Sequence, residues 1–274
     1  MFSVSLTDAS ANKLRRALRL HRSALLSNSA ENQLIDLWAG LEGLVSRPGR
    51  ESQRLEYFSE CLLPSLTLCY PEKLFMSAYR DLSKVAPKAR TYAATLSGTD
   101  SSFSKFVRLV LCQGYDSQRQ EFIELLKPLP LLLNKVWRLS EMFKSRTATQ
   151  QTLRRHRQKL AWHIARIYHT RNSIMHSATA LPHLPTLVEN LHVYVDSLIR
   201  SVQKTANLSP ERISIDGVLQ YLAVWERYRL HAITHEGGNN DAQPTDSDVW
   251  SIVFGERLAL APRQDSEPTL SFAQ

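Results

Sequence analysis

The feature that most constrains the fold is a long helical pattern over residues 148–177, a stretch without any acidic residue. With a repeat of 3.6 residues, its apolar positions form one stripe that a core can bury, which predicts a long amphipathic helix. The stripe consists of Leu153, Leu160, Ile164, Ile167 and Ile174. Arg171 falls within this stripe. Because arginine stays charged and its burial without a partner is costly, an inward Arg171 predicts that a carboxylate or a phosphate receives it.

Helical periodicity also runs through most of the remaining sequence, whereas alternating strand patterns are few. A Ser/Thr/Gly-rich span near 96–104 predicts a loop. The pattern and the capping residues predict further helices at 8–27, 30–45, 53–63, 72–85, 103–112, 117–126, 131–143, 184–206 and 210–235. We therefore expect an all-α helical bundle without a substantial β-sheet.

The composition changes after residue 236, where polar residues and proline become frequent. This predicts one helical domain over 1–236, followed by a polar, mobile tail over 237–274. Within the domain we expect core elements at 8–46 and 148–206 and a helical insert at 47–147. An apolar patch at 249–254 predicts a docking segment within the tail.

The net charge of +8 is concentrated in one part of the chain. Between Glu141 and Glu189 there is no acidic residue, while eight basic residues fall in this window. They are Lys144, Arg146, Arg154, Arg155, Arg157, Lys159, Arg166 and Arg171. Without these eight, 26 basic residues face 26 acidic ones, so the rest of the chain is neutral overall. Such a focused field favours a polyanionic partner, most simply RNA, although a solvated helix face is the alternative for the 154–159 cluster.

Other features exclude several classes of protein. Three cysteines, Cys61, Cys69 and Cys112, are odd in number and lack metal-ligand spacing, which indicates reduced thiols. No apolar run approaches the length of about 18 residues that a membrane-spanning helix needs, and the first residues lack a signal-peptide pattern. We expect a cytoplasmic protein with no membrane association. No motif predicts a metal ion or another cofactor.

Two motifs in separate helices carry a resemblance to a known family. The basic helix ends in Arg-Asn-Ser-Ile-Met-His (171–176), and an early helix carries Leu-Trp-Ala-Gly-Leu-Glu (37–42). Together they resemble HEPN domains, and within these the Apea-like group, over roughly residues 13–200, with only generic helices matching over 47–147. The resemblance implies a helical bundle that forms a homodimer, in which two Arg/His sets face one composite cleft. It further implies a metal-independent endoribonuclease, often a toxin or an anti-phage defence effector, or a catalytically inactive scaffold.

The residue types in these motifs suit RNA cleavage without a metal. His176 carries an imidazole, whose ordinary pKa of about 6.5 allows it to act as base or acid. Arg171 can bind the non-bridging phosphate oxygens, and Asn172 can orient His176 or hold a phosphate. The ribose 2′-hydroxyl is the expected nucleophile and a 2′,3′-cyclic phosphate the expected product. Glu42 is expected to receive Arg171 in an ion pair. The expected RNA-binding residues are Arg154, Arg155, Arg157, Lys159 and Arg166.

Two alternatives stay open from the sequence. In the first, the protein binds RNA or an acidic partner without catalysis. Arg171 then forms a structural salt bridge with Glu42, and His176 is favoured by the helix macrodipole. In the second, the chain is an effector subunit that a regulatory, antitoxin-like partner holds inactive through 249–254. Trp162 and Tyr168 either stack on bases or pack in the protein.

Overall fold

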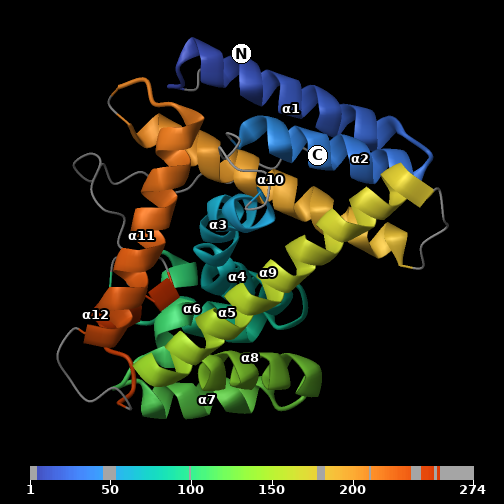
Figure 1. Ribbon diagram of the computed structural model, residues 1–274. Coiled ribbons are helices and arrows are strands. Elements are labelled where there is room, and N and C mark those ends of the chain that lie inside the picture. Colours follow the sequence, from blue (N-terminus) through green and yellow to red (C-terminus); the bar gives the residue numbers. More distant parts are fainter. Residues whose placement is uncertain are drawn as a thin grey trace. The chain divides into compact units, whose positions relative to one another are not determined.

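The computed structural model describes residues 5–45, 54–98, 100–177, 183–209, 211–235, 242–249 and 252–253. Within these residues the chain is all-α (Figure 1), which confirms the predicted fold class. The one β-type pairing among them is an isolated bridge between Leu6 and Ile213. The helices are α1 (Asp8–Leu26), α2 (Ala30–Leu44), α3 (Arg54–Thr67), α4 (Tyr70–Val85), α5 (Pro87–Ala94), α6 (Ser102–Leu111), α7 (Asp116–Leu126), α8 (Pro130–Met142), α9 (Arg146–Ser177), α10 (Leu184–Leu208), α11 (Ile215–His235) and α12 (Asp246–Val249).

Local signals explain where these helices begin. The Ser29 hydroxyl caps α2 by accepting the N–H of Asn32 at 3.3 Å, and the Ser101 hydroxyl caps α6 by accepting that of Ser104 at 3.2 Å. Proline occupies the first or second position of α4, α5, α8 and α10, where its missing N–H costs nothing. The sequence does not predict α5 and α12, which have eight and four residues and are too short for a periodic signal.

Two compact units make up the chain. The first comprises Met1–Leu68 and Arg155–Arg227, and the second comprises Cys69–Arg154 and Tyr228–Gln274. The predicted arrangement of one domain over 1–236 with an insert over 47–147 has different boundaries. Two of the observed boundaries fall inside α9 and α11, where the helical pattern continues without interruption. Periodicity along the sequence therefore gives no sign of the division.

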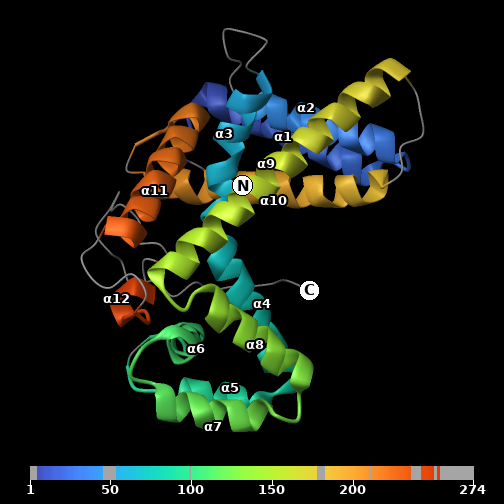
Figure 2. The ribbon, with the colours of Figure 1, turned by 60° about the horizontal axis from the view of Figure 1, so that its bottom comes forward.

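The first unit has a core built from α1, α2, α3, α9, α10 and α11. Within it, α1 and α2 lie side by side, and α10 packs against α2 (Figures 1 and 2). Three residues of the predicted apolar stripe, Leu160, Ile164 and Ile167, are buried in this core, and Ile174 packs against it. Leu153, the first residue of the stripe, belongs to the core of the second unit instead. The stripe is thus divided between two cores.

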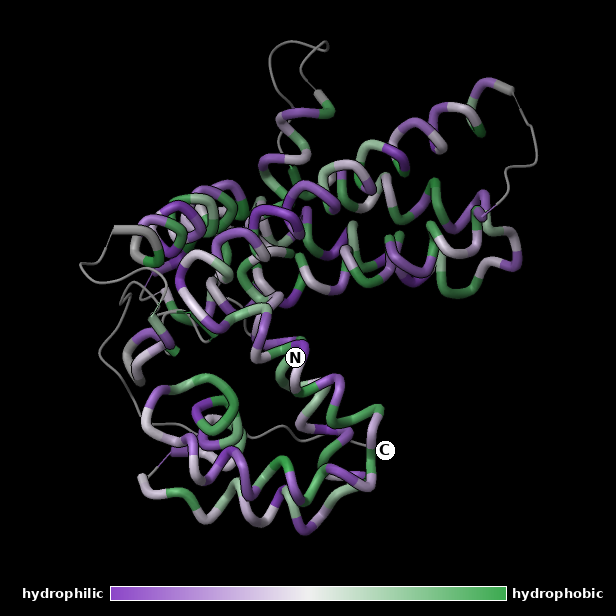
Figure 3. The backbone as a smooth tube through the Cα atoms, turned by 90° about the horizontal axis from the view of Figure 1, so that it is seen from below, coloured by the Kyte–Doolittle hydropathy of each residue, from purple (hydrophilic) through white to green (hydrophobic). Residues whose placement is uncertain are grey.

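The second unit contains a core rich in aromatic residues, to which α4 to α9 and the C-terminal helices contribute. The rings of Phe75 and Phe143 lie 5.6 Å apart between centroids, and those of Phe106 and Phe122 lie 6.1 Å apart. All four side chains are fully buried. Figure 3 shows apolar and polar residues alternating along the helices, as expected of helices that bury one side.

The predicted docking segment at 249–254 lies partly within the described residues. Val249, Ile252 and Val253 are buried in the core of the second unit. Asp248 pairs with Arg146 at 2.7 Å, and the Arg229 guanidinium donates to the carbonyl of Ile252. These three apolar side chains are therefore not available to a partner protein. The other residues of the segment and most of the predicted tail over 237–274 lie outside the described residues.

None of the described helices has the length and the apolar character that a membrane crossing requires.

Trp38 and Trp162 provide a matched test of the first unit's core. Trp38 is buried, and its ring lies 4.7 Å from that of Phe58 and 5.7 Å from that of Tyr168, between centroids. Trp38→Ala is expected to lower the free energy of unfolding by about 3–5 kcal/mol, because it leaves a large cavity. Trp162→Ala is expected to change it by less than about 0.5 kcal/mol, because the side chain is exposed. Urea unfolding followed by circular dichroism measures both, and equal losses would contradict the described core.

Candidate nucleic-acid interface

From Arg155 onward, α9 has one continuous exposed face. Residues at alternating spacings of four and three lie on the same side of a helix. Along α9 this series is exposed throughout and consists of Arg155, Lys159, Trp162, Arg166, His169, Ser173 and His176. We refer to these seven residues as the α9 face. It combines three cations, two histidines and a tryptophan that is 66% exposed, and it contains no acidic side chain.

The five predicted RNA-binding residues do not share one position. Arg155, Lys159 and Arg166 lie on the α9 face, and Arg154 is exposed one position before it. Arg157 is only half-buried, and its guanidinium is engaged within the protein. Four of the five are therefore placed to meet a ligand from solvent.

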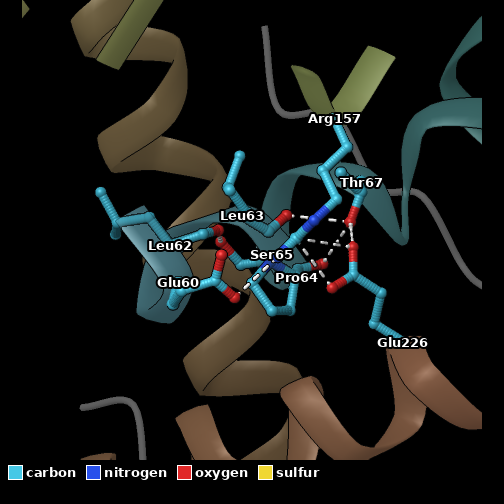
Figure 4. Close-up of polar contacts among 8 residues, drawn as sticks. All are labelled: Glu60, Leu62, Leu63, Pro64, Ser65, Thr67, Arg157 and Glu226. Carbon is cyan, nitrogen blue, oxygen red and sulfur yellow. Dashed lines mark hydrogen bonds and ion pairs between the residues drawn. The ribbon is translucent and has the colours of Figure 1, made fainter. Parts of the chain in front are cut away.

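Arg157 belongs to a polar cluster that joins α3, α9 and α11 in the first unit (Figure 4). Its guanidinium donates to Glu226 at 3.0 Å and to Glu60 at 2.7 Å. Glu226 is buried and also accepts a hydrogen bond from the Thr67 hydroxyl. Burial raises the pKa of the Glu226 carboxyl, while the Thr67 hydrogen bond and the Arg157 charge oppose this rise. The arrangement gives Arg157 a structural role, in contrast to its predicted role in RNA binding.

Arg171 lies on the half-buried side of α9, as its position in the apolar stripe predicts. Its Nη1 donates to the side-chain oxygen of Asn172 at 3.0 Å. Its Nε is buried and is the one buried side-chain nitrogen or oxygen without a hydrogen-bond partner among the described residues. This N–H can donate a hydrogen bond to an oxygen of a phosphate or a carboxylate, which would remove the cost of leaving it unsatisfied.

Glu42 is not the partner that the sequence predicts for Arg171. Among the ion pairs of the described residues, none joins these two side chains. Instead, the Glu42 carboxylate accepts the indole N–H of Trp38 at 2.8 Å, one turn earlier on α2. This bond satisfies the polar edge of a buried tryptophan, which gives Glu42 a local structural role.

His176 lies in the last turn of α9 and is exposed. Since successive residues of a helix are turned by about 100°, its side chain leaves the helix about 140° away from that of Arg171. Asn172 lies between the two, about 100° from Arg171. One copy of the helix therefore carries Arg171 toward the core and His176 toward solvent. The three predicted catalytic residues share one helix end without sharing one face.

A histidine that the sequence does not single out as functional, His163, makes a defined contact on the side of α9 that adjoins α10. Its Nδ1 lies 2.9 Å from the Tyr194 hydroxyl. Burial, followed by the charge of Arg166, lowers the pKa of His163, and burial raises the pKa of Tyr194. Both changes favour the neutral forms, so this pair serves as a neutral hydrogen bond between α9 and α10.

The helix α1 carries a second basic surface, which is not among the predicted RNA-binding residues. This helix contains five basic residues and one acidic residue, Asp8. The basic residues are Lys13, Arg15, Arg16, Arg19 and Arg22. Counting charge over the whole chain hides this local excess, because acidic residues elsewhere balance it. The helical pattern places Arg15, Arg19 and Arg22 on one side, and this signal could have identified them from the sequence.

Within the described part of the chain, no group of three or more His, Cys, Asp or Glu side chains is arranged to hold a metal ion. Among the described residues the three cysteines form no disulfide, and Cys112 is buried whereas the other two are half-buried.

No protein-family model, curated protein or solved structure matches this chain. The resemblance to HEPN domains stays a prediction from the two motifs.

Neighbouring arginines of α9 allow a test of the polar cluster. Arg157→Ala is expected to lower the free energy of unfolding by about 2 kcal/mol at neutral pH, because it strands the buried Glu226 carboxylate. Arg155→Ala, on the exposed face, is expected to change it by less than about 0.5 kcal/mol.

The effect of Arg157→Ala should depend on pH in a defined direction. A raised pKa means that the folded protein binds the Glu226 proton more tightly than the unfolded chain, so stability falls as pH rises above the ordinary value of 4.5. Without the Arg157 charge, the free energy of unfolding falls further at neutral pH, where Glu226 is ionised. The difference in free energy of unfolding between wild type and variant should therefore shrink as pH falls toward 4 and Glu226 takes up a proton. Urea unfolding at several pH values measures the deficit, and one that is constant with pH would contradict the coupling.

Proposed function

We propose that the protein is a metal-independent endoribonuclease that binds RNA along the α9 face and cleaves it at the C-terminal end of α9. The observation that carries this proposal is the buried Nε of Arg171, which lacks an acceptor. An unsatisfied buried donor costs about 1–3 kcal/mol, and a phosphate oxygen is an acceptor of suitable charge and geometry. Among the buried polar atoms of the described residues, the one without a hydrogen bond thus belongs to the residue that the motif assigns to the phosphate.

The α9 face supports RNA as the ligand. Arg155, Lys159 and Arg166 are exposed cations that can neutralise phosphates, and no acidic residue of α9 competes with the RNA. Trp162 lies among them with most of its surface exposed, in a position to stack on a base. Cations combined with an exposed aromatic ring are typical of surfaces that bind single-stranded nucleic acid.

The proposed reaction requires only side chains and the ribose. His176 takes the proton of the 2′-hydroxyl, and the 2′-oxygen forms a bond to phosphorus. The bond from phosphorus to the 5′-oxygen breaks, and this leaving oxygen takes up a proton from a general acid. Arg171 stabilises the negative charge on the non-bridging oxygens, and Asn172 orients either the imidazole or the phosphate. The products are a 2′,3′-cyclic phosphate and a 5′-hydroxyl.

A homodimer would complete this site. Because Arg171 and His176 leave one helix about 140° apart, a single copy carries them to different sides. In a twofold-symmetric pair, Arg171 of one protomer and His176 of its partner can approach the same phosphate. Where both Arg/His sets meet in one cleft at the twofold axis, one His176 acts as the base and the other as the general acid. The HEPN resemblance implies the same dimeric assembly. With the resemblance we also propose that the protein is a toxin or defence effector, which a regulatory partner controls.

One observation favours a second function, a non-catalytic RNA-binding scaffold. Arg171 points toward the protein side of α9 and is bonded to Asn172, the residue next to it. In this case the α9 face binds RNA, whereas Arg171 and His176 take no part in chemistry.

Substitution of His176 distinguishes the two functions. His176→Ala is expected to lower the rate of RNA cleavage by about two to four orders of magnitude, since it removes the general acid/base. The fold and the RNA affinity should change little, because the side chain is exposed at a helix end. Cleavage of total RNA by the purified protein measures the rate, and activity should persist in excess EDTA.

His231→Ala, which alters an exposed histidine of α11 in the second unit, is the matched control and should leave cleavage unchanged. Arg171→Ala should also abolish cleavage. If the wild-type protein binds RNA without cleaving it, the scaffold function holds. Cleavage that disappears with EDTA would end the proposed mechanism.

Trp162 allows a test of stacking. Trp162→Ala is expected to weaken binding of single-stranded RNA by about 1–3 kcal/mol, while the salt dependence of binding stays the same because no charge is lost. Trp137→Ala, an exposed tryptophan of the second unit, is the control. Fluorescence anisotropy with labelled RNA measures both, and equal affinities of the two variants would argue against stacking.

A further inference from the structure

The exposed side of α1 carries an arginine ridge. Arg15, Arg19 and Arg22 follow one another at spacings of four and three residues, which places them on one side of the helix, and all three are exposed. Arg16 is also exposed, at the edge of this ridge. The opposite side of α1, with Leu14, Ala17 and Ala24, is buried in the first unit.

No acidic side chain of the described residues neutralises these guanidinium groups. Within the described residues, Arg16, Arg19 and Arg22 form no ion pair and no side-chain hydrogen bond, and Arg15 donates only to Asn12 and the carbonyl of Ala11 on its own helix. Lys13 differs, since it lies 3.6 Å from Asp216. Four arginines thus present their charge to solvent over two turns of helix, with every donor of three of them available.

We infer that the arginine ridge of α1 is a second contact for the phosphate backbone of RNA. This inference rests on the proposed function, because it assigns further binding residues for the same substrate. The distance from Arg15 to Arg22 along the helix is about 10 Å, enough to meet two or three successive phosphates of a strand. Guanidinium groups bind phosphate oxygens through paired N–H donors, which favours arginine over lysine at such a contact.

The distribution of apolar residues favours RNA over a lipid surface. A helix that lies in a membrane interface buries its apolar face in the lipid and carries its cations on the opposite, polar face. The arginines of α1 also occupy a polar face, so what decides between the two partners is whether the apolar face of α1 is available. The exposed Leu18 and Leu25 lie together along one edge of the ridge, and Leu26 lies at the helix end. The apolar face of α1 is already occupied by the protein core.

A salt titration tests the inference on the full-length protein carrying His176→Ala, which prevents cleavage. The affinity for a labelled, mixed-sequence, single-stranded RNA is measured by anisotropy at several salt concentrations. Arg15→Gln, Arg19→Gln and Arg22→Gln together should lower the slope of log K against log salt by about two, because three phosphate contacts are lost. The corresponding triple lysine variant should keep the slope, since it keeps the charge.

Two further triple variants serve as references. Lys84→Gln, Lys88→Gln and Arg138→Gln remove the same charge from exposed positions of the second unit and should leave the slope unchanged. Arg155→Gln, Lys159→Gln and Arg166→Gln alter the α9 face. If this variant loses affinity while the α1 variant behaves like the control, the inference is overturned and the proposed function stands. If both behave like the control, both fail.

Vesicles containing phosphatidylserine provide the remaining arm. If the wild-type protein binds them, the α1 variant does not, and the two bind RNA equally, the ridge recognises a lipid surface and the inference is overturned. A loss of RNA affinity in the α1 variant without a loss of helical circular dichroism supports it.

Discussion

The first unit depends on how α9 buries its inner side. This side carries arginines, and α9 has no carboxylate of its own to pair with them. Two arginines, Arg157 and Arg171, lie on that side, 14 residues or about four turns apart. For Arg157 the acids come from other helices, Glu60 on α3 and Glu226 on α11. Arg171 forms no ion pair among the described residues, and its Nε lacks an acceptor. The contrast within one helix separates an arginine whose charge is paired inside the fold from one that keeps a buried N–H without an acceptor.

Much of the fold could be predicted from the sequence, because apolar periodicity and capping residues act locally. The predicted bounds of α1, α2 and α10 lie within two residues of the observed ones. The division into two units could not be predicted, because two of its boundaries lie inside α9 and α11. A periodic pattern shows which side of a helix is buried but does not show in which core. Leu153 and Leu160 belong to one stripe in the sequence and to two cores in the structure.

The candidate site was predictable to a lesser extent. The hydrogen-bond and ion-pair partners of a polar side chain come from residues that only the fold brings close. The inward position of Arg171 followed from the apolar stripe. Among the described residues no ion pair joins it to Glu42, whose carboxylate accepts the indole N–H of Trp38 on its own helix. Arg157 stands beside exposed arginines in the sequence, and only the position of Glu226, 69 residues later, shows that it points inward. Whole-chain charge counting, in turn, concealed the arginines of α1.

The two kinds of arginine also differ in what they can contribute to RNA recognition. Exposed cations of α1 and of the α9 face attract a phosphate backbone over a distance and without regard to sequence, and salt weakens this attraction. A half-buried guanidinium such as Arg171 is screened less, and the cost of its unsatisfied N–H is present before any ligand arrives. A phosphate that reaches it removes this cost. In the proposed endoribonuclease, the phosphate would remove this cost only when one of its oxygens lies within hydrogen-bonding distance and direction of Nε. Such a requirement for position suits a cleavage site, whereas exposed cations bind a phosphate backbone without it.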